Sequence, residues 1–167
     1  MGTVKGIYIA AEAGGGLHGV WTVRAVAGHG LEGDRYAAGV GFYSATPTTD
    51  GARELTLIEQ ESIDAVRKEG GIELADGETR RNVVTGGIRL KNLLGKRFTI
   101  GAVVCEGVRD CPPCNHLDEL TGKSLMRLLV RTGGLRARIV EGGTIAVEDR
   151  IEIVGEAAGP SQAKVTS

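Results

Sequence analysis

The clearest strand signal in the chain is the segment Arg97-Phe98-Thr99-Ile100-Gly101-Ala102-Val103-Val104-Cys105-Glu106-Gly107-Val108. β-Branched and aromatic residues lie on both sides of Gly101, and this composition is typical of two strands that meet at a glycine. The segment therefore predicts a β-rich domain. Cys105 lies inside the second of these strands, so we expect its thiol to be buried and structural.

Further strands are expected on both sides of this segment. The strand-like runs cover residues 4–10, 20–26, 54–58, 81–85, 135–140 and 144–154. Two short helices are also expected: one over residues 58–70, with an apolar face at helical spacing, and one over residues 117–129, with a stripe of leucines. Strands on both sides of each helix favour a mainly β fold of the α+β class, with a mixed, mostly antiparallel sheet curled toward a barrel.

Length and composition predict a single domain. The chain has 167 residues, of which 41% are hydrophobic and 27 are glycine, and this is enough for one core without a disulfide or metal. We assign residues 1–154 to this domain and the small, polar residues 155–167 to a disordered tail. Residues 39–51 are rich in glycine, serine and threonine, and we expect a mobile loop there, near the functional site.

Charge and hydropathy exclude two classes of partner. The chain has 20 basic and 21 acidic residues, so its formal charge of -1 does not favour nucleic acid or anionic membranes. No apolar run approaches the ~20 residues of a membrane span, and the first residues lack the layout of a signal peptide. We therefore expect a cytoplasmic protein.

The strongest chemical signal is the segment Arg109-Asp110-Cys111-Pro112-Pro113-Cys114-Asn115-His116, between an expected strand and an expected helix. The positive end of a helix lowers the pKa of a nearby thiol, as do Arg109 and a protonated His116. Cys114 is therefore the first candidate for a thiolate. Cys111 is the second, because the two prolines that follow it have no N–H to donate.

Four interpretations of this pair of thiols stay open. A thioredoxin-like pair normally follows the first strand of a βαβ unit, which is not expected here. A zinc site built from Cys105, Cys111, Cys114 and His116 lacks a second pair of ligands at the usual spacing. In the third interpretation the thiols are inert and lie in a turn made rigid by proline. In the fourth, which is favoured, they are reactive, either as nucleophiles or as ligands of molybdenum.

A basic segment supplies a second candidate site. Six cations lie within residues 80–97, and runs of this kind are usually solvated faces. Successive side chains on a strand point to opposite faces, so one of Arg80 and Arg81 is expected to turn inward. Asn82 beside them offers both a donor and an acceptor, as a phosphate or the edge of a pterin requires.

Several motifs follow one another in a distinctive order. They are Gly30-Leu31-Glu32-Gly33-Asp34, Leu55-Thr56-Leu57-Ile58, Arg80-Arg81-Asn82, Gly87-Ile88, Leu94-Gly95-Lys96-Arg97-Phe98, Cys111-Pro112-Pro113-Cys114, Gly133-Gly134, Gly142-Gly143 and Asp149. Together they resemble the MOSC domain, the C-terminal domain family of molybdenum cofactor sulfurases, over residues 5–154. Two residues depart from the family pattern: Tyr36 stands where many relatives carry histidine, and Glu148 stands where glycine commonly precedes Asp149.

The resemblance implies a barrel-like domain that binds the molybdenum cofactor, a pterin whose dithiolene holds molybdenum and whose tail carries phosphate. Cys114 would then be the molybdenum ligand or the sulfur-carrying thiol, with Cys111 beside it. The expected cofactor-binding residues are Arg80, Arg81, Asn82, Gly33, Asp34, Arg109 and His116.

The function that this resemblance implies is reduction of N-hydroxylated compounds such as hydroxylamines. No pyridoxal-phosphate, flavin or iron–sulfur motif is present, so a stand-alone, bacterial-type member would take electrons from a separate electron-donor protein. The alternatives are a persulfide sulfur carrier for metal–sulfur or molybdenum cofactor assembly, supplied by a donor such as a cysteine desulfurase, and a cofactor carrier without catalysis. A homodimer is also expected as a candidate assembly, because a bare domain of this family leaves part of its pocket exposed.

Overall fold

The computed structural model describes residues 2–10, 18–34, 54–70, 81–110 and 134–156 of the chain. Within these ranges the elements are, in chain order, β1 (Gly2–Ile9), β2 (His18–Val20), β3 (Thr22–Val26), β4 (Gly30–Leu31), β5 (Leu55–Glu59), α1 (Gln60–Gly70), β6 (Val83–Gly86), the 3-10 helix η1 (Leu90–Leu93), β7 (Lys96–Ile100), β8 (Val103–Asp110), β9 (Leu135–Glu141), β10 (Gly143–Ala146) and β11 (Arg150–Glu156). The helix predicted over 117–129, the loop predicted over 39–51 and residues 157–167 of the predicted tail lie outside the described residues.

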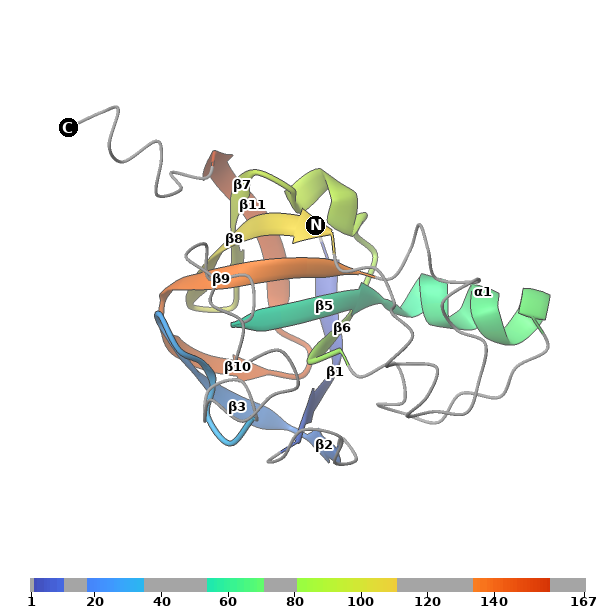
Figure 1. Ribbon diagram of the computed structural model, residues 1–167, viewed down its shortest axis with the longest axis horizontal. Helices are drawn as coiled ribbons and strands as arrows, with labels where there is room; N and C mark the ends of the chain where they lie inside the picture. Colours follow the sequence, from blue (N-terminus) through green and yellow to red (C-terminus); the bar gives the residue numbers. More distant parts are fainter. Residues whose placement is uncertain (1, 11–17, 35–53, 71–80, 111–133, 157–167) are drawn as a thin grey trace.

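Seven of these strands close into a barrel in the order β1-β6-β5-β9-β8-β7-β11, because β11 pairs both with β7 and with β1 (Figure 1). Strand β2 extends this sheet beyond β1, while β10, β3 and β4 form a second, three-stranded sheet. Among the described strand pairs only β5 and β6 are parallel, and α1 lies in the connection between them. The predicted mainly β, mostly antiparallel and barrel-like fold is confirmed.

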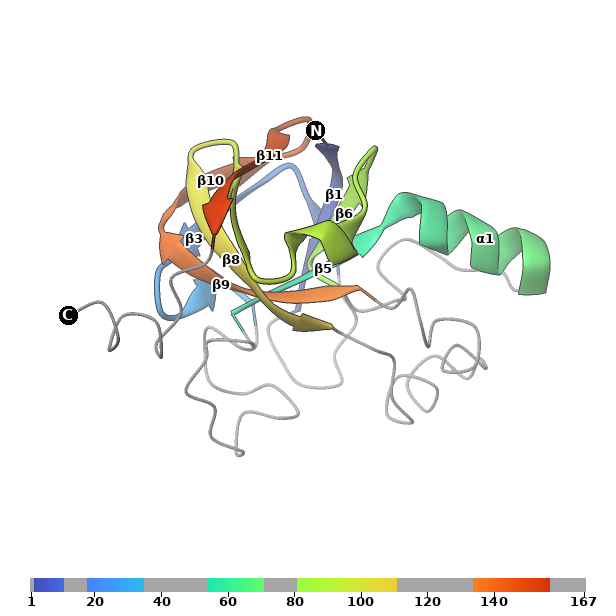
Figure 2. The same ribbon diagram turned by 90° about the horizontal axis from the view of Figure 1, so that it is seen from above.

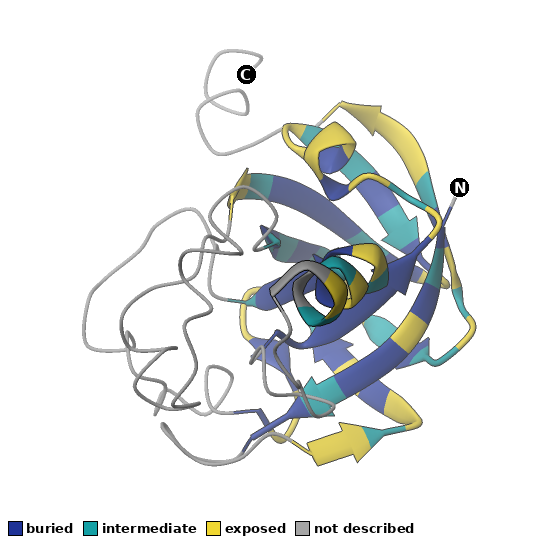
Figure 3. Cartoon of the chain, turned by 90° about the vertical axis from the view of Figure 1, so that its right-hand side faces the viewer, coloured by how far each residue is buried: buried dark blue, intermediate teal, exposed yellow. Residues whose placement is uncertain are grey.

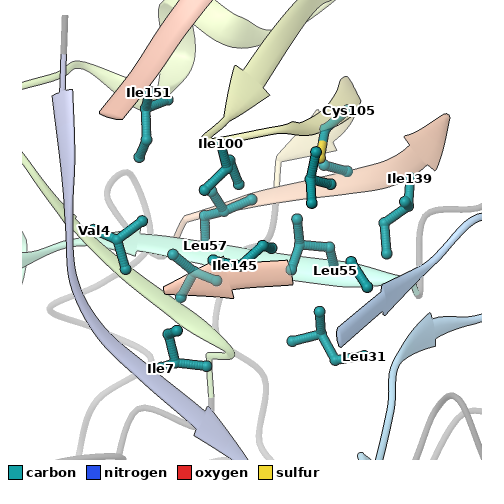
Figure 4. Packing of buried hydrophobic residues seen from close by; sticks show 14 of the residues in the cluster. Val4, Ile7, Leu31, Leu55, Leu57, Ile100, Cys105, Ile139, Ile145 and Ile151 are labelled. Carbon is teal, nitrogen blue, oxygen red and sulfur yellow. The ribbon is translucent and has the colours of Figure 1, made fainter. Parts of the chain in front are cut away.

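The strands form because apolar side chains alternate along them and fill the barrel. In β9, Leu135, Ala137 and Ile139 are buried, while the residues between them are only partly buried. Alternate residues of a strand point to opposite faces, so this pattern gives each strand one core face and one outer face. Cys105 belongs to the same core and is fully buried, as predicted (Figure 4).

The helix α1 extends away from the barrel (Figures 1 and 2). Its acidic Glu61 lies in the first turn and its basic Arg67 and Lys68 lie in the last turn, which suits the helix dipole. Ile63 is buried, and Figure 3, which looks along the helix, shows that its exposed residues lie on one side of it. The predicted helix is thus confirmed, except that Ile58 belongs to β5. No helix in the described part of the chain has the length and apolar character needed to cross a membrane.

Two predicted strands are wrong in extent because turns interrupt them. The strand predicted over 144–154 splits into β10 and β11, since Asp149 Oδ2 accepts a hydrogen bond from Ala146 N at 2.9 Å and closes a turn. Within this turn Glu148 has φ +83°, a left-handed conformation that glycine adopts at lower cost. The strand predicted over 20–26 is interrupted at Trp21, a residue that is 79% exposed.

Candidate functional site

The predicted site residues fall into two groups. Arg80, Cys111, Cys114 and His116 lie outside the described residues, as does Tyr36. Gly33, Asp34, Arg81, Asn82 and Arg109 are described, and the strand pairings fix their relative positions.

Strand register brings Asn82 and Arg109 onto one outer face of the barrel. Arg109 of β8 pairs with Arg136 of β9, and Arg136 pairs with Thr56 of β5. Thr56 Oγ1 in turn accepts a hydrogen bond from Asn82 N at 3.0 Å, and the backbone oxygen of Asn82 accepts one from Tyr8 N at 2.7 Å. We call these five residues, Tyr8, Asn82, Thr56, Arg136 and Arg109, the polar row. Since their neighbours Leu55, Leu57, Leu135 and Ala137 belong to the core, the row lies on the opposite face.

Asn82 ties three strands together at one end of the row. Its Oδ1 accepts hydrogen bonds from Thr56 N at 3.3 Å and Thr56 Oγ1 at 3.1 Å, while its Nδ2 donates to Tyr8 O at 3.1 Å. Its side chain is buried, so these contacts are shielded from water. Asn82 therefore holds the start of β6 against β1 and β5. It also fixes the backbone beside Arg81, whose side chain is buried, as expected for the arginine that turns inward.

Gly33 and Asp34 lie near the same end of β1. Gly33 has φ +87°, a left-handed conformation, and directs the chain into Asp34. The buried Asp34 accepts a hydrogen bond from Ala10 N at 3.0 Å, and Ala10 lies two residues beyond Tyr8. Asp34 thus ties the chain after β4 to the end of β1 that carries the polar row.

Arg136 is a candidate site residue that reasoning from the sequence missed. It lies directly opposite Arg109, and like charges placed opposite each other on neighbouring strands destabilise a sheet. In the described part of the chain no acidic side chain forms an ion pair with Arg136. Arg136 is therefore a candidate for binding an anion at this position. The available signal was the alternation of Arg136 and Arg138 with apolar residues, which places both arginines on the outer face.

Lys96 and Arg97, two cations of the predicted basic segment, form ion pairs with acidic side chains of the fold. Arg97 donates two hydrogen bonds to Glu106 Oε2, at 3.1 Å from Nε and 2.8 Å from Nη2. Arg138 donates two more to Glu106 Oε1, and Glu106 itself is 1% exposed. Lys96 pairs with Glu156. These ion pairs stabilise the sheet, so the charges of Lys96, Arg97 and Arg138 are compensated within the fold.

Cys105 does not fit the zinc interpretation. Burial raises the pKa of its thiol far above the ordinary range, and the nearby charge of Glu54 adds to this shift. The side chain of Cys105 also packs among apolar residues of the barrel core, whereas a structural zinc ion needs four ligating side chains around one point. Among the described residues no group of three or more His, Cys, Asp or Glu side chains is arranged to hold a metal ion.

The family of the chain follows from its sequence as well as its barrel. The sequence profile of the MOSC domain matches residues 29–152, which is most of the chain. The chain belongs to the MOSC domain family. No curated protein matched it in a sequence search.

Solved structures share the fold of this MOSC domain at low sequence identity. The YuaD protein from Bacillus subtilis superposes with a TM-score of 0.76 at 16% identity, over 94% of this chain and 98% of YuaD. YiiM from Geobacillus stearothermophilus gives a TM-score of 0.68 at 13% identity, over 92% of this chain and 75% of YiiM. YiiM from Escherichia coli gives 0.63 at 19% identity, over 93% and 71%. At these identities the likeness concerns the fold alone.

Proposed function

We propose that this MOSC domain binds the molybdenum cofactor beside the polar row, holds molybdenum through Cys114 and supports the reduction of N-hydroxylated compounds such as hydroxylamines. One observation carries the proposal. Strand β8, which leads into the segment containing Cys111 and Cys114, ends next to Arg136 on the face that also carries Asn82. Strand register thus puts the end of β8 on the same face of the barrel as Asn82, and this supports the proposal of one shared site.

The chemistry of the described residues fits an anionic cofactor. Arg109 and Arg136 are adjacent on the outer face, and a guanidinium can bind a phosphate through two parallel hydrogen bonds. Arg81 is a further cation held at the start of β6 by the contacts of Asn82. These arginines would bind the phosphate and orient the pterin, while Asn82 and Asp34 act as positioning residues.

The bound cofactor would supply a molybdenum centre that removes oxygen from an N–OH group with two electrons. A thiolate is a soft ligand and suits such a centre, which is the role assigned to Cys114. A separate electron-donor protein would provide the electrons, since the sequence has no flavin or iron–sulfur motif.

Anaerobic purification followed by molybdenum and pterin analysis tests the proposal. We expect both to copurify with the chain, and we expect Cys114→Ser to abolish reduction of hydroxylamine by a chemical electron donor. Arg136→Gln should lower the bound pterin, whereas Arg150→Gln, which removes an exposed arginine of β11, should not.

The outcomes separate the alternatives. Cyanide-labile sulfur on Cys114 without molybdenum would favour the persulfide carrier and contradict the proposal. Bound cofactor without any reductase activity would favour the cofactor carrier. Equal pterin content in Arg136→Gln and Arg150→Gln would remove the polar row from the binding site.

A further inference from the structure

A cavity of about 470 Å³ lies between the start of α1 and the loop that joins β6 to η1. It is lined by Glu59, Glu61, Ser62, Ala65, Gly87, Ile88 and Arg89. None of these residues belongs to the polar row, and the proposed cofactor chemistry uses none of them. The volume falls in the range of small-molecule sites.

Two carboxylates in the cavity are oriented by backbone groups. Glu59 Oε2 accepts a hydrogen bond from Leu90 N at 3.3 Å, and Glu61 Oε2 accepts one from Gly87 N at 2.9 Å. In the described part of the chain the second oxygen of each carboxylate makes no hydrogen bond. The two acids are therefore held in place with one oxygen each left to bind a cation.

Ser62 and Arg89 add the groups that an acidic cluster alone would lack. Ser62 lines the cavity, is only 6% exposed, and its hydroxyl has no hydrogen-bond partner within the described chain. The hydroxyl therefore faces the cavity and is available to hydrogen-bond a ligand there. Arg89 is exposed at the rim and forms no ion pair with any described acidic residue.

We propose that this cavity is a second ligand site, specific for a basic α-amino acid such as lysine. Its side-chain or α-ammonium group would lie between Glu59 and Glu61, and its carboxylate would bind Arg89. Ala65 and Ile88 would contact its methylenes, and Ser62 would hydrogen-bond one of its polar groups. The two carboxylates and single guanidinium give the cavity a net negative charge, which a ligand of charge +1 complements.

The binding test uses the unaltered protein and three related probes. L-Lysine is titrated by calorimetry and by amide NMR, beside cadaverine, which lacks the carboxylate, and norleucine, which lacks the side-chain ammonium. Each missing charge removes a charge-assisted hydrogen bond, so lysine should bind about tenfold or more tightly than either. The NMR shifts should fall on residues 59–65 and 87–89.

Variants test which cavity residues bind the carboxylate and the ammonium groups of the ligand. Arg89→Gln should weaken lysine about tenfold and leave cadaverine unchanged, while Lys91→Gln, which removes an exposed cation of η1 outside the cavity, should change neither. Glu59→Gln keeps an oxygen for Leu90 N and should weaken both ligands. The proposal is overturned if lysine binds no tighter than norleucine, or if the NMR shifts map to other residues. Both results come from the unaltered protein, so they stand even if a variant fails to fold.

Discussion

Glu106 holds two arginines on the outer face of the barrel, and removing it should be costly. Glu106→Ala leaves the guanidinium groups of Arg97 and Arg138 without their carboxylate, and their side chains are only 36% and 28% exposed. Breaking a fully buried pair costs roughly 3–5 kcal/mol, and partial exposure of both arginines reduces this to about 2–3 kcal/mol. For a chain of this length the loss lowers the melting temperature by about 4–12 °C.

Urea and thermal unfolding of matched variants measure this effect. Glu152→Ala, which removes a partly exposed acid of β11, is the control and should change stability by less than about 0.5 kcal/mol. The triple variant Arg97→Met, Glu106→Leu, Arg138→Met should lose less than Glu106→Ala alone, because it leaves no buried charge without a partner. A loss for Glu106→Ala as small as that of the control, or a triple variant weaker than the single one, would refute this reasoning.

Three further changes test other parts of the barrel. Glu148→Gly should stabilise the fold by about 0.5 kcal/mol in thermal unfolding, because relief of the left-handed φ exceeds the entropy that glycine adds to the unfolded chain; Glu148→Ala should give no gain. Burial raises the pKa of the Glu54 carboxyl above its ordinary 4.5, so the folded state binds the carboxyl proton more tightly than the unfolded state does. The free energy of unfolding of the unaltered protein, relative to that of Glu54→Gln, should therefore rise as pH falls from about 7 to 4. A relative free energy of unfolding that falls over this range would contradict the expectation. Native alkylation should leave Cys105 unmodified until unfolding, as peptide mass spectrometry can show, and labelling of Cys105 in the folded protein would be inconsistent with its place in the core.

Local patterns predicted most of the strands because one face of each packs on the core. The alternation over residues 135–140 and the apolar runs on both sides of Gly101 are sufficient for β7, β8 and β9. The breaks at Trp21 and at 147–149 were missed because β-branched residues continue on both sides of each turn. At the second break the turn depends on the Asp149 side chain, which binds Ala146 N, and composition alone does not show this contact.

The candidate site was predictable only in part, because it depends on register between strands. The arginines of the 80–82 motif stand out by charge, but Asn82 accepts a hydrogen bond from Thr56 and donates one to Tyr8, and these residues are 26 and 74 positions away. The pairing of Arg109 with Arg136 likewise appears only when β8 and β9 are aligned. A shift of one residue would turn Arg136 into the core, so burial of Leu135 and Ala137 keeps Arg136 on the outer face.

Strand β8 links the core to the candidate site, and Gly107 is the residue that allows it. Cys105 packs in the core, whereas Arg109, near the end of the same strand, lies on the polar row. Between them Gly107 pairs with Leu94 and accepts a hydrogen bond from Gly95 N at 3.0 Å, and a Cβ at this position would overlap the carbonyl oxygen of Leu93. Any side chain at Gly107 would therefore displace either η1 or the end of β8. The position of this strand end beside Arg136 therefore depends on a glycine that carries no chemistry itself.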